Sequence, residues 1–196
     1  MTGFPTPFGS DDGEDGVRPD GSDEAAGFDD VDEFVPEHLP EPGPFLEEGE
    51  VLTGEDHAEF HRTTREAFEE RGVYDVTFGY NLARLNLDRR HPDAGFRYAE
   101  TEDGALRAEF TPTTEFCPQS GTLTKGALRA WNGLSDRHGY DVVRVRVAPS
   151  HHRSEAINGT LADLESALDG EDAGDERGGG AATADAPTGD ATRSPF

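Results

Sequence analysis

Cysteine is nearly absent from this chain, since Cys117 is the only one among 196 residues. A single cysteine excludes a disulfide within the chain, so packing must hold the fold, and a reducing cytoplasm is the expected compartment. Apolar runs of about 18 residues, long enough to span a membrane, are also absent. The N-terminal stretch "MTGFPTPFGSDDGEDG" has neither a basic region nor an apolar segment, so we expect neither a signal peptide nor a membrane anchor.

Lysine is equally scarce, because Lys125 is the only lysine among the 17 basic residues. With 42 acidic residues the net charge is −25, which argues against direct nucleic-acid binding, since such binding needs basic patches. A chain this acidic resembles proteins of extreme halophiles, whose cytoplasm holds molar salt that screens self-repulsion. A DNA mimic or an acidic interaction tail is the alternative, although the excess acid lies in Gly/Pro-rich segments rather than on a shaped surface.

The charges divide the chain into three parts. Residues 1–52 hold 16 acidic residues and one basic residue, and residues 169–196 hold seven and two. Residues 53–168 hold 19 and 14, and they carry almost all of the hydrophobic periodicity. We therefore expect a disordered acidic leader, one folded domain and a disordered tail. Five apolar residues of the leader form either a short docking motif or part of a solubilising extension: Phe34, Val35, Leu39, Phe45 and Leu46.

Hydrophobic periodicity predicts the order of elements in the central domain. A helix is expected over residues 55–71, and the alternation within residues 96–113 predicts a β-hairpin. A second helix over residues 119–137 is followed by a strand over residues 141–147, and a last amphipathic helix begins at Ser154. This order predicts a small two-layer α+β sandwich, helix-strand-strand-helix-strand-helix, in which helices cover one face of the sheet.

Cys117 lies in "TPTTEFCPQS", between the predicted hairpin and the second helix. If that helix begins near Pro118, its unpaired N–H groups and its dipole favour a thiolate, the form of cysteine that attacks electrophiles and binds soft metals. The alternative is an inert cysteine, because free cysteine is among the most buried residue types. Several neighbouring side chains have hydrogen-bonding groups that could orient a ligand: Thr113, Thr114, Gln119, Ser120 and Thr122.

Two longer stretches, "AEFTPTTEFCPQSGTL" and "YDVVRVRVAPSHHRSEAINGTLADLESAL", follow one another around an amphipathic helix. In this order, residues 75–168 resemble the iron–sulfur assembly family that contains SufT, the PaaD-type proteins and the cytosolic iron–sulfur targeting-complex subunit of eukaryotes, which share a metal–sulfur cluster biosynthesis domain. The matching residues are Thr111, Pro112, Thr113, Cys117, Pro149, Ser150, His151, Ser154, Glu155, Ile157 and Asn158. The family's Asp-Pro-Glu corresponds to Asp75, Val76 and Thr77, so only the aspartate is kept.

The resemblance implies a cytoplasmic, non-enzymatic accessory factor in iron–sulfur cluster assembly or delivery, with Cys117 as its working residue. A cluster needs about four protein ligands, so one thiol can hold it only transiently. An iron–sulfur carrier, a client apoprotein or a homodimer with two copies of Cys117 would supply the other ligands. The residues expected to support Cys117 or to close its pocket are Thr113, Ser120, Thr122, His151, Asn158 and Asp75.

Histidine pairs offer alternatives to this interpretation. His57 and His61 stand four residues apart, a spacing that can chelate zinc, but two ligands without a third favour a solvated helix face. His151 or His152 could act as the base for Cys117 in a cysteine-dependent hydrolase or transferase. A third interpretation is an adaptor of the same fold whose cysteine is only structural.

Overall fold

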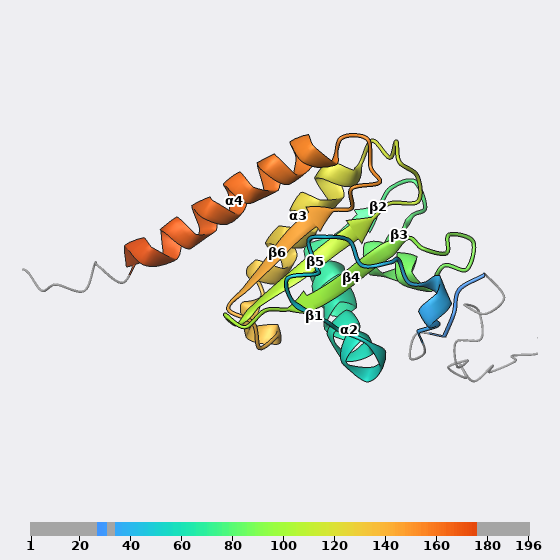
Figure 1. Ribbon diagram of the computed structural model, residues 1–196, viewed down its shortest axis with the longest axis horizontal. Helices are drawn as coiled ribbons and strands as arrows, with labels where there is room; N and C mark the ends of the chain where they lie inside the picture. The colour runs from blue at the N-terminus through green and yellow to red at the C-terminus, as the bar shows by residue number, and fades with distance from the viewer. Residues whose placement is uncertain (1–26, 31–33, 176–196) are drawn as a thin grey trace, which may run out of the picture.

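A four-stranded sheet forms the centre of the protein (Figure 1), in the order β1-β4-β5-β6. The computed structural model describes residues 27–30 and 34–175, so the disorder predicted for residues 1–26 and 176–196 lies outside the described residues. β4 and β5 form the predicted antiparallel hairpin, whereas β5 and β6 run parallel, which requires a crossover between them. The strands are β1 (Glu50–Val51), β4 (Gly95–Glu100), β5 (Ala105–Thr111) and β6 (Val142–Val147).

Three α-helices in the described residues pack around this sheet, and the predicted α+β class is confirmed. They are α2 (Gly54–Arg71), α3 (Ser120–Asn132), which makes the crossover, and α4 (Ser154–Asp175). Shorter elements connect them: η1 (Pro36–His38), β2 (Tyr74–Asp75), β3 (Tyr80–Asn81), η2 (Leu82–Leu87) and η3 (Ser135–Arg137). No helix in the described ranges combines the length and the apolar character that crossing a membrane requires.

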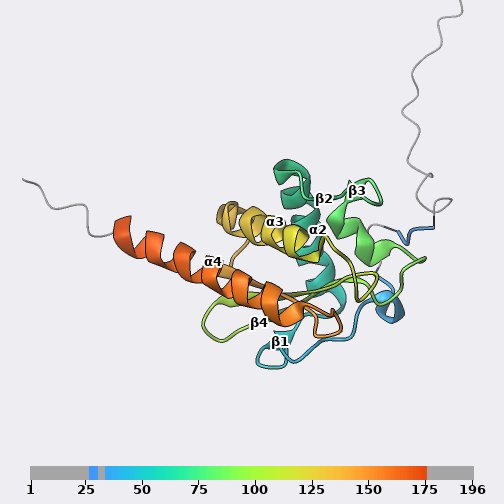
Figure 2. The same cartoon turned by 90° about the horizontal axis from the view of Figure 1, so that it is seen from above.

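The helix boundaries differ from the predicted ones at two places. The helix predicted over residues 119–137 is divided, because α3 ends at Asn132 and the separate turn η3 follows. The Asn132 side chain bonds both backbone groups of Val143 on β6, which ties the end of the helix to the sheet. At the other end of the domain, α4 continues to Asp175, beyond the predicted boundary at residue 168, and extends past the sheet in both views (Figures 1 and 2).

An aromatic core lies between the sheet and the helices α2 and α3. Trp131 of α3 is fully buried and its ring lies 4.9 Å from Phe68 of α2 and 5.3 Å from Phe96 of β4, measured between centroids. The Trp131 indole N–H donates to Thr64 Oγ1 at 3.1 Å, so its polar atom is satisfied inside the core. Burial of each such aromatic side chain removes about 150–250 Å² of surface from water, which makes these rings the main source of core stability.

The histidines of α2 are buried, so the predicted solvated helix face is wrong. His61 donates from Nε2 to the Ala83 carbonyl at 2.8 Å and contacts the Tyr98 hydroxyl through Nδ1 at 2.7 Å. The His57 ring stacks 5.7 Å from His61 and meets the Phe34 ring edge-on at 4.9 Å, but both of its ring nitrogens lack a hydrogen-bond partner among the described residues. Neutral imidazole packs here as an aromatic ring, which the pattern of charged neighbours on α2 did not reveal.

Part of the predicted leader belongs to the fold, which corrects the domain boundary at residue 53. Leu46 is fully buried, and the Phe45 ring lies 4.9 Å from the guanidinium groups of Arg107 and Arg146 on the outer face of the sheet. The Gly43 N–H donates to the Glu109 carboxylate at 2.8 Å, so close that a side chain at residue 43 would collide with it. This segment therefore covers the sheet face opposite α2 and α3, and two cation–π contacts hold it there.

Side chains of α3 and α4 close the β6 edge of the sheet. Asn132 and Asn158 each accept the N–H and donate to the C=O of one β6 residue, Val143 and Val147 respectively. Between them, Glu165 of α4 accepts the Val145 N–H at 2.9 Å. Each outward backbone N–H of β6 thus has a side-chain acceptor, which removes the cost of an unpaired donor at the end of the sheet.

Candidate functional site

Cys117 lies in the loop that leads from β5 to α3, three residues before the first residue of the helix. Its backbone N–H donates to the Thr114 carbonyl at 3.2 Å, and its carbonyl accepts the Ser120 N–H at 3.4 Å. These bonds form two successive turns that place the thiol next to the amino end of α3. The residue is partly exposed, so the full burial expected of an inert cysteine is not what the structure shows.

A groove of about 520 Å³ opens beside this thiol, and we call it the Cys117 groove. One wall comes from the first turns of α3, including Thr122 and Lys125, and the other from the start of α4, including Arg153 and Ile157. Neither Lys125 nor Arg153 forms an ion pair within the described residues. In a chain with a net charge of −25, this groove therefore combines a thiol, two cationic side chains and apolar wall atoms.

The two histidines of the β6–α4 loop lie beside the cysteine, as expected, but they bind its backbone rather than its sulfur. His151 donates from Nε2 to the Cys117 carbonyl at 3.0 Å, and its Nδ1 accepts the Arg153 N–H at 3.2 Å. Both ring nitrogens are thus occupied, which leaves none to take a proton from the thiol. His152 is exposed and donates from Nδ1 to the Glu115 carbonyl at 2.8 Å. These bonds give the histidines a positioning role for the loop.

Of the other predicted supporting residues, only Thr122 lines the groove. Ser120 is fully buried, and its hydroxyl has no partner among the described residues. The side-chain amide of Asn158 accepts the Val147 N–H and donates to the Val147 carbonyl, so Asn158 anchors α4 to β6 rather than closing the pocket. Thr113 is partly buried in the loop and does not line the groove.

Asp75 is linked to the cysteine loop indirectly, through Thr77. Its carboxylate accepts the N–H groups of Thr77 at 2.7 Å and Phe78 at 3.3 Å, which fixes the turn between β2 and β3. The Thr77 hydroxyl then accepts a hydrogen bond from the Gln119 side chain at 2.7 Å, next to the start of α3. The aspartate that the resemblance singled out therefore orders a turn that contacts the cysteine loop.

Metal binding by this chain alone has no ready site in the described part. Within residues 27–30 and 34–175, no three side chains of His, Cys, Asp or Glu are grouped so that they could hold a metal ion. Cys117 would supply one thiolate, and any cluster bound to it would take its other ligands from a second molecule.

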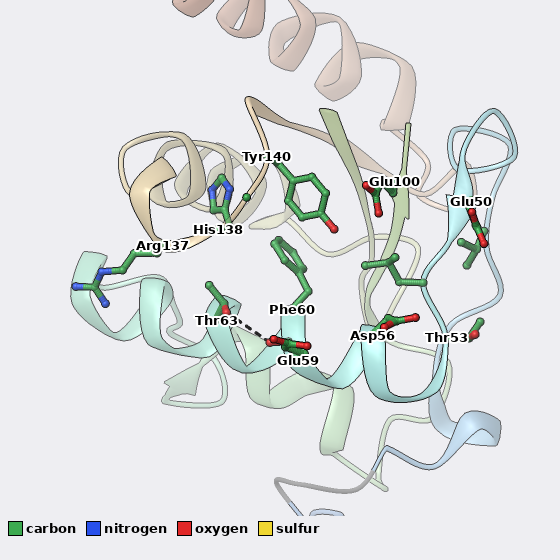
Figure 3. A pocket seen from close by; sticks show the side chains of 13 residues that line it. Glu50, Thr53, Asp56, Glu59, Phe60, Thr63, Glu100, Arg137, His138 and Tyr140 are labelled. Carbon is green, nitrogen blue, oxygen red and sulfur yellow. Dashed lines mark hydrogen bonds between the residues drawn. The ribbon is translucent and has the colours of Figure 1, made fainter. Parts of the chain in front are cut away.

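Sequence reasoning missed a second hollow, of about 610 Å³, that α2 borders together with β1, β4 and the residues after η3 (Figure 3). We call it the acidic hollow. Four of its lining residues are carboxylates, from β1, α2 and β4, and its aromatic part comes from Phe60 and Tyr140. Because these residues come from segments far apart in the sequence, no local pattern could have identified them. The lining carboxylates are Glu50, Asp56, Glu59 and Glu100.

The fold and the Cys117 groove together define a small α+β protein that presents one thiol at the start of a crossover helix. Residues 26–175 match the family described as a domain of unknown function, DUF7998, and the chain belongs to this family. The match begins ahead of the segment that covers the outer face of the sheet and ends with α4, in agreement with the corrected domain boundaries. No curated protein and no solved structure matches the chain.

Proposed function

We propose that this protein is an accessory factor in iron–sulfur cluster assembly or delivery in the cytoplasm, in which Cys117 is a transient ligand or contact for a cluster carried by another protein. The observation that carries the proposal is the partly exposed thiol on a groove that also holds Lys125 and Arg153. The resemblance of its motifs to those of the metal–sulfur cluster biosynthesis domain is the second ground for the proposal.

The charges of the groove suit such a cargo. A cluster bound by thiolates carries net negative charge, and nearby cations stabilise it and adjust its reduction potential. Elsewhere the acidic surface of this chain repels anions, since 42 acidic residues oppose 17 basic ones. Lys125 and Arg153 therefore place two positive charges on the Cys117 groove, where the single thiol is partly exposed.

The number of ligands suits delivery better than storage. One thiolate is far short of the four that a stable cluster needs, and no group of three metal-binding side chains exists in the described ranges. Ligand exchange with a cysteine-rich carrier, or a homodimer that brings together two copies of Cys117, would complete the set. The geometry of His151, whose two nitrogens are both occupied, gives no comparable support to a thiol enzyme.

Cluster transfer measured with purified components tests the proposal. A carrier loaded with iron and sulfide is mixed with an apoprotein, and the rate of transfer is recorded with wild-type chain, with Cys117→Ser, and with Lys125→Gln combined with Arg153→Gln. We expect Cys117→Ser to abolish the acceleration and the double variant to reduce it. The assay is run at low and at molar KCl because of the acidic composition. Unchanged transfer with Cys117→Ser would end the proposal and leave an adaptor whose cysteine is structural.

A further inference from the structure

The lining of the Cys117 groove contains no acidic residue, although 42 of the 196 residues of the chain are Asp or Glu. Three other hollows in the described part of the chain each have at least three carboxylates in their lining. Lys125, the only lysine of the chain, and Arg153 face each other across this groove from the first turns of α3 and α4, whose amino ends lie side by side (Figures 1 and 2). The groove is therefore a cationic surface on an acidic protein.

Exposed apolar side chains adjoin these two charges. Phe116 lines the groove with 63% of its surface exposed, and its ring lies 5.1 Å from that of His152. Val76 is 79% exposed and directly precedes Thr77, which accepts a hydrogen bond from Gln119 of the cysteine loop. Apolar side chains gathered in this way at the surface indicate a contact with another segment. Together with the cations, they suit a segment that is both acidic and aromatic.

Residues 1–26, which we call the N-terminal arm, have this chemistry. Seven of them are acidic and one is basic, and two phenylalanines stand just ahead of a run of four carboxylates in "FPTPFGSDDGED". Residues 176–196, at the other end of the chain, hold three acidic and two basic residues, so they carry almost no net charge. The N-terminal arm is therefore the better electrostatic complement to the groove. The residues that match it are Phe4, Phe8, Asp11, Asp12, Glu14 and Asp15.

The point at which the N-terminal arm joins the described chain is within its reach of the groove. Phe28 pairs with Asp88, and its ring packs 5.4 Å from that of Tyr80 on β3. The turn of the β2–β3 hairpin in turn contacts the cysteine loop through Thr77 and Gln119. A chain of 26 residues spans up to about 80 Å. Residues 176–196, by contrast, follow the far end of α4, which is 22 residues or about 33 Å long and starts at the groove.

We propose that the N-terminal arm docks on the Cys117 groove of its own chain, with its carboxylates at Lys125 and Arg153 and a phenylalanine against Phe116 and Ile157. Because the arm and the groove belong to one chain, the effective concentration is on the order of millimolar, and a weak contact that a partner can displace is sufficient. The docked arm covers the thiol until a partner replaces it. This regulation of access, although not the docking itself, rests on the proposed function of Cys117.

Crosslinking of the full-length chain tests the docking, because Lys125 offers the only lysine amine. A carbodiimide joins an amine to a carboxylate only where the two are in direct contact. The reaction is run at the lowest KCl concentration at which circular dichroism shows folded protein, and the peptides joined to Lys125 are identified by mass spectrometry. We expect them to contain residues 11–15. An equal mixture of ¹⁵N-labelled and unlabelled protein should give products of one isotope only, since the contact lies within a chain.

Alkylation of Cys117 by iodoacetamide measures how far the arm covers the thiol. Phe4→Ser combined with Phe8→Ser should raise the rate about 2- to 10-fold, because the arm then spends less time on the groove. Phe196→Ser is the matched control, since it removes a phenylalanine from the other end of the chain, and it should leave the rate unchanged. Thermal melting confirms that the variants are folded.

Four results would overturn the proposal. They are the lack of any crosslink to Lys125, crosslinks only to carboxylates outside residues 1–26, products that mix the two isotopes, and an alkylation rate that Phe4→Ser with Phe8→Ser leaves as in wild type. Neither measurement involves iron or sulfide. Failure of cluster transfer would therefore leave the docking intact, and failure of the docking would leave the proposed function of Cys117 intact.

Discussion

His151 holds the backbone of Cys117 through a hydrogen bond of 3.0 Å between its Nε2 and the Cys117 carbonyl oxygen. The His151 side chain is almost fully buried, and its Nδ1 accepts a hydrogen bond as well. The ring therefore holds the cysteine loop in place and does not act as a base for the thiol. Because both of its nitrogens are bonded, His151 has none left to act as the base that a cysteine-dependent enzyme would need.

Replacement of His151 by alanine is expected to loosen the loop without changing the acid–base behaviour of the thiol. The lost buried hydrogen bond should lower the free energy of unfolding by about 1–3 kcal/mol. The rate of alkylation at Cys117, the only thiol in the chain, should rise, while the shape of its pH profile should stay the same. Denaturant unfolding and iodoacetamide kinetics measure the two effects. A pH profile that changes with His151→Ala but not with His152→Ala would instead indicate a cysteine–histidine pair.

As the pH is lowered, the protein should lose stability at a higher pH than protonation of its carboxylates alone would cause. Burial, with smaller effects from His61 and Arg97, lowers the pKa of His57 to about 2, and burial lowers that of His61 to about 4, against 6.5 in the unfolded chain. The unfolded chain therefore binds more protons below pH 6.5, so stability falls as the pH falls, by up to about 1.4 kcal/mol per pH unit for each histidine. The window lies between about pH 6.5 and pH 4 for both groups.

Urea unfolding at several pH values in this window measures the slope of the free energy of unfolding. His57→Phe keeps a ring in the same space and cannot bind a proton, so the slope should fall by about half. Identical slopes in the two proteins would show that His57 is not a source of the acid sensitivity.

Truncation of Leu46 tests whether the N-terminal segment is part of the folded domain. Leu46 is fully buried against the outer face of the sheet, so Leu46→Ala should lower the free energy of unfolding by about 2–5 kcal/mol. Glu47 is exposed, and Glu47→Ala is the matched control with an expected change below about 0.5 kcal/mol. If both variants melted like the wild type, the segment would be a solubilising leader after all.

Glu165 is predicted to be the critical contact between α4 and the sheet. It accepts the Val145 N–H at 2.9 Å and pairs with Arg146 at 2.7 Å. Glu165→Ala leaves the buried Val145 N–H without an acceptor and removes the carboxylate partner of Arg146, which keeps only its bond to the Val145 carbonyl; this should cost about 2–4 kcal/mol. Glu165→Gln keeps an acceptor for the backbone and should cost less. Chemical denaturation of both, with the exposed Asp163→Ala as control, gives the comparison, and equal losses in Glu165→Gln and Glu165→Ala would refute the role of the backbone bond.

The sequence was sufficient for the elements whose patterns are local. The apolar face of α3, with Leu123, Ala127, Leu128 and Trp131, and the alternation of β6 follow directly from the spacing of side chains. The position of Cys117 between β5 and α3 followed from the same patterns. The end of α3 after Asn132 also has a local signal, since Gly133 is the C-cap residue, whereas the bond between Asn132 and Val143, eleven positions away, is reported by no local pattern.

The predictions that failed have one physical cause in common. Local composition does not report which distant residues a side chain contacts in the folded protein. The acidic composition of the first 52 residues predicts an unstructured segment. In the structure, however, Phe45 packs against two arginines of the sheet and Leu46 is buried, and these contacts exist only once the sheet has formed. His57 looked solvated because its helix neighbours are charged, although its own face of α2 points at Phe34 and Tyr98. The acidic hollow could not be predicted, because β1, α2 and the chain after η3 meet only in three dimensions.

The side chains of Asn132, Glu165 and Asn158 also restrict how this protein can associate with others. They occupy the outward N–H groups of β6, so an incoming chain cannot extend the sheet by adding a strand there unless it displaces them. Strand addition at the β6 edge is therefore blocked by side chains of α3 and α4, whereas the Cys117 groove is a hollow open at the surface of the protein.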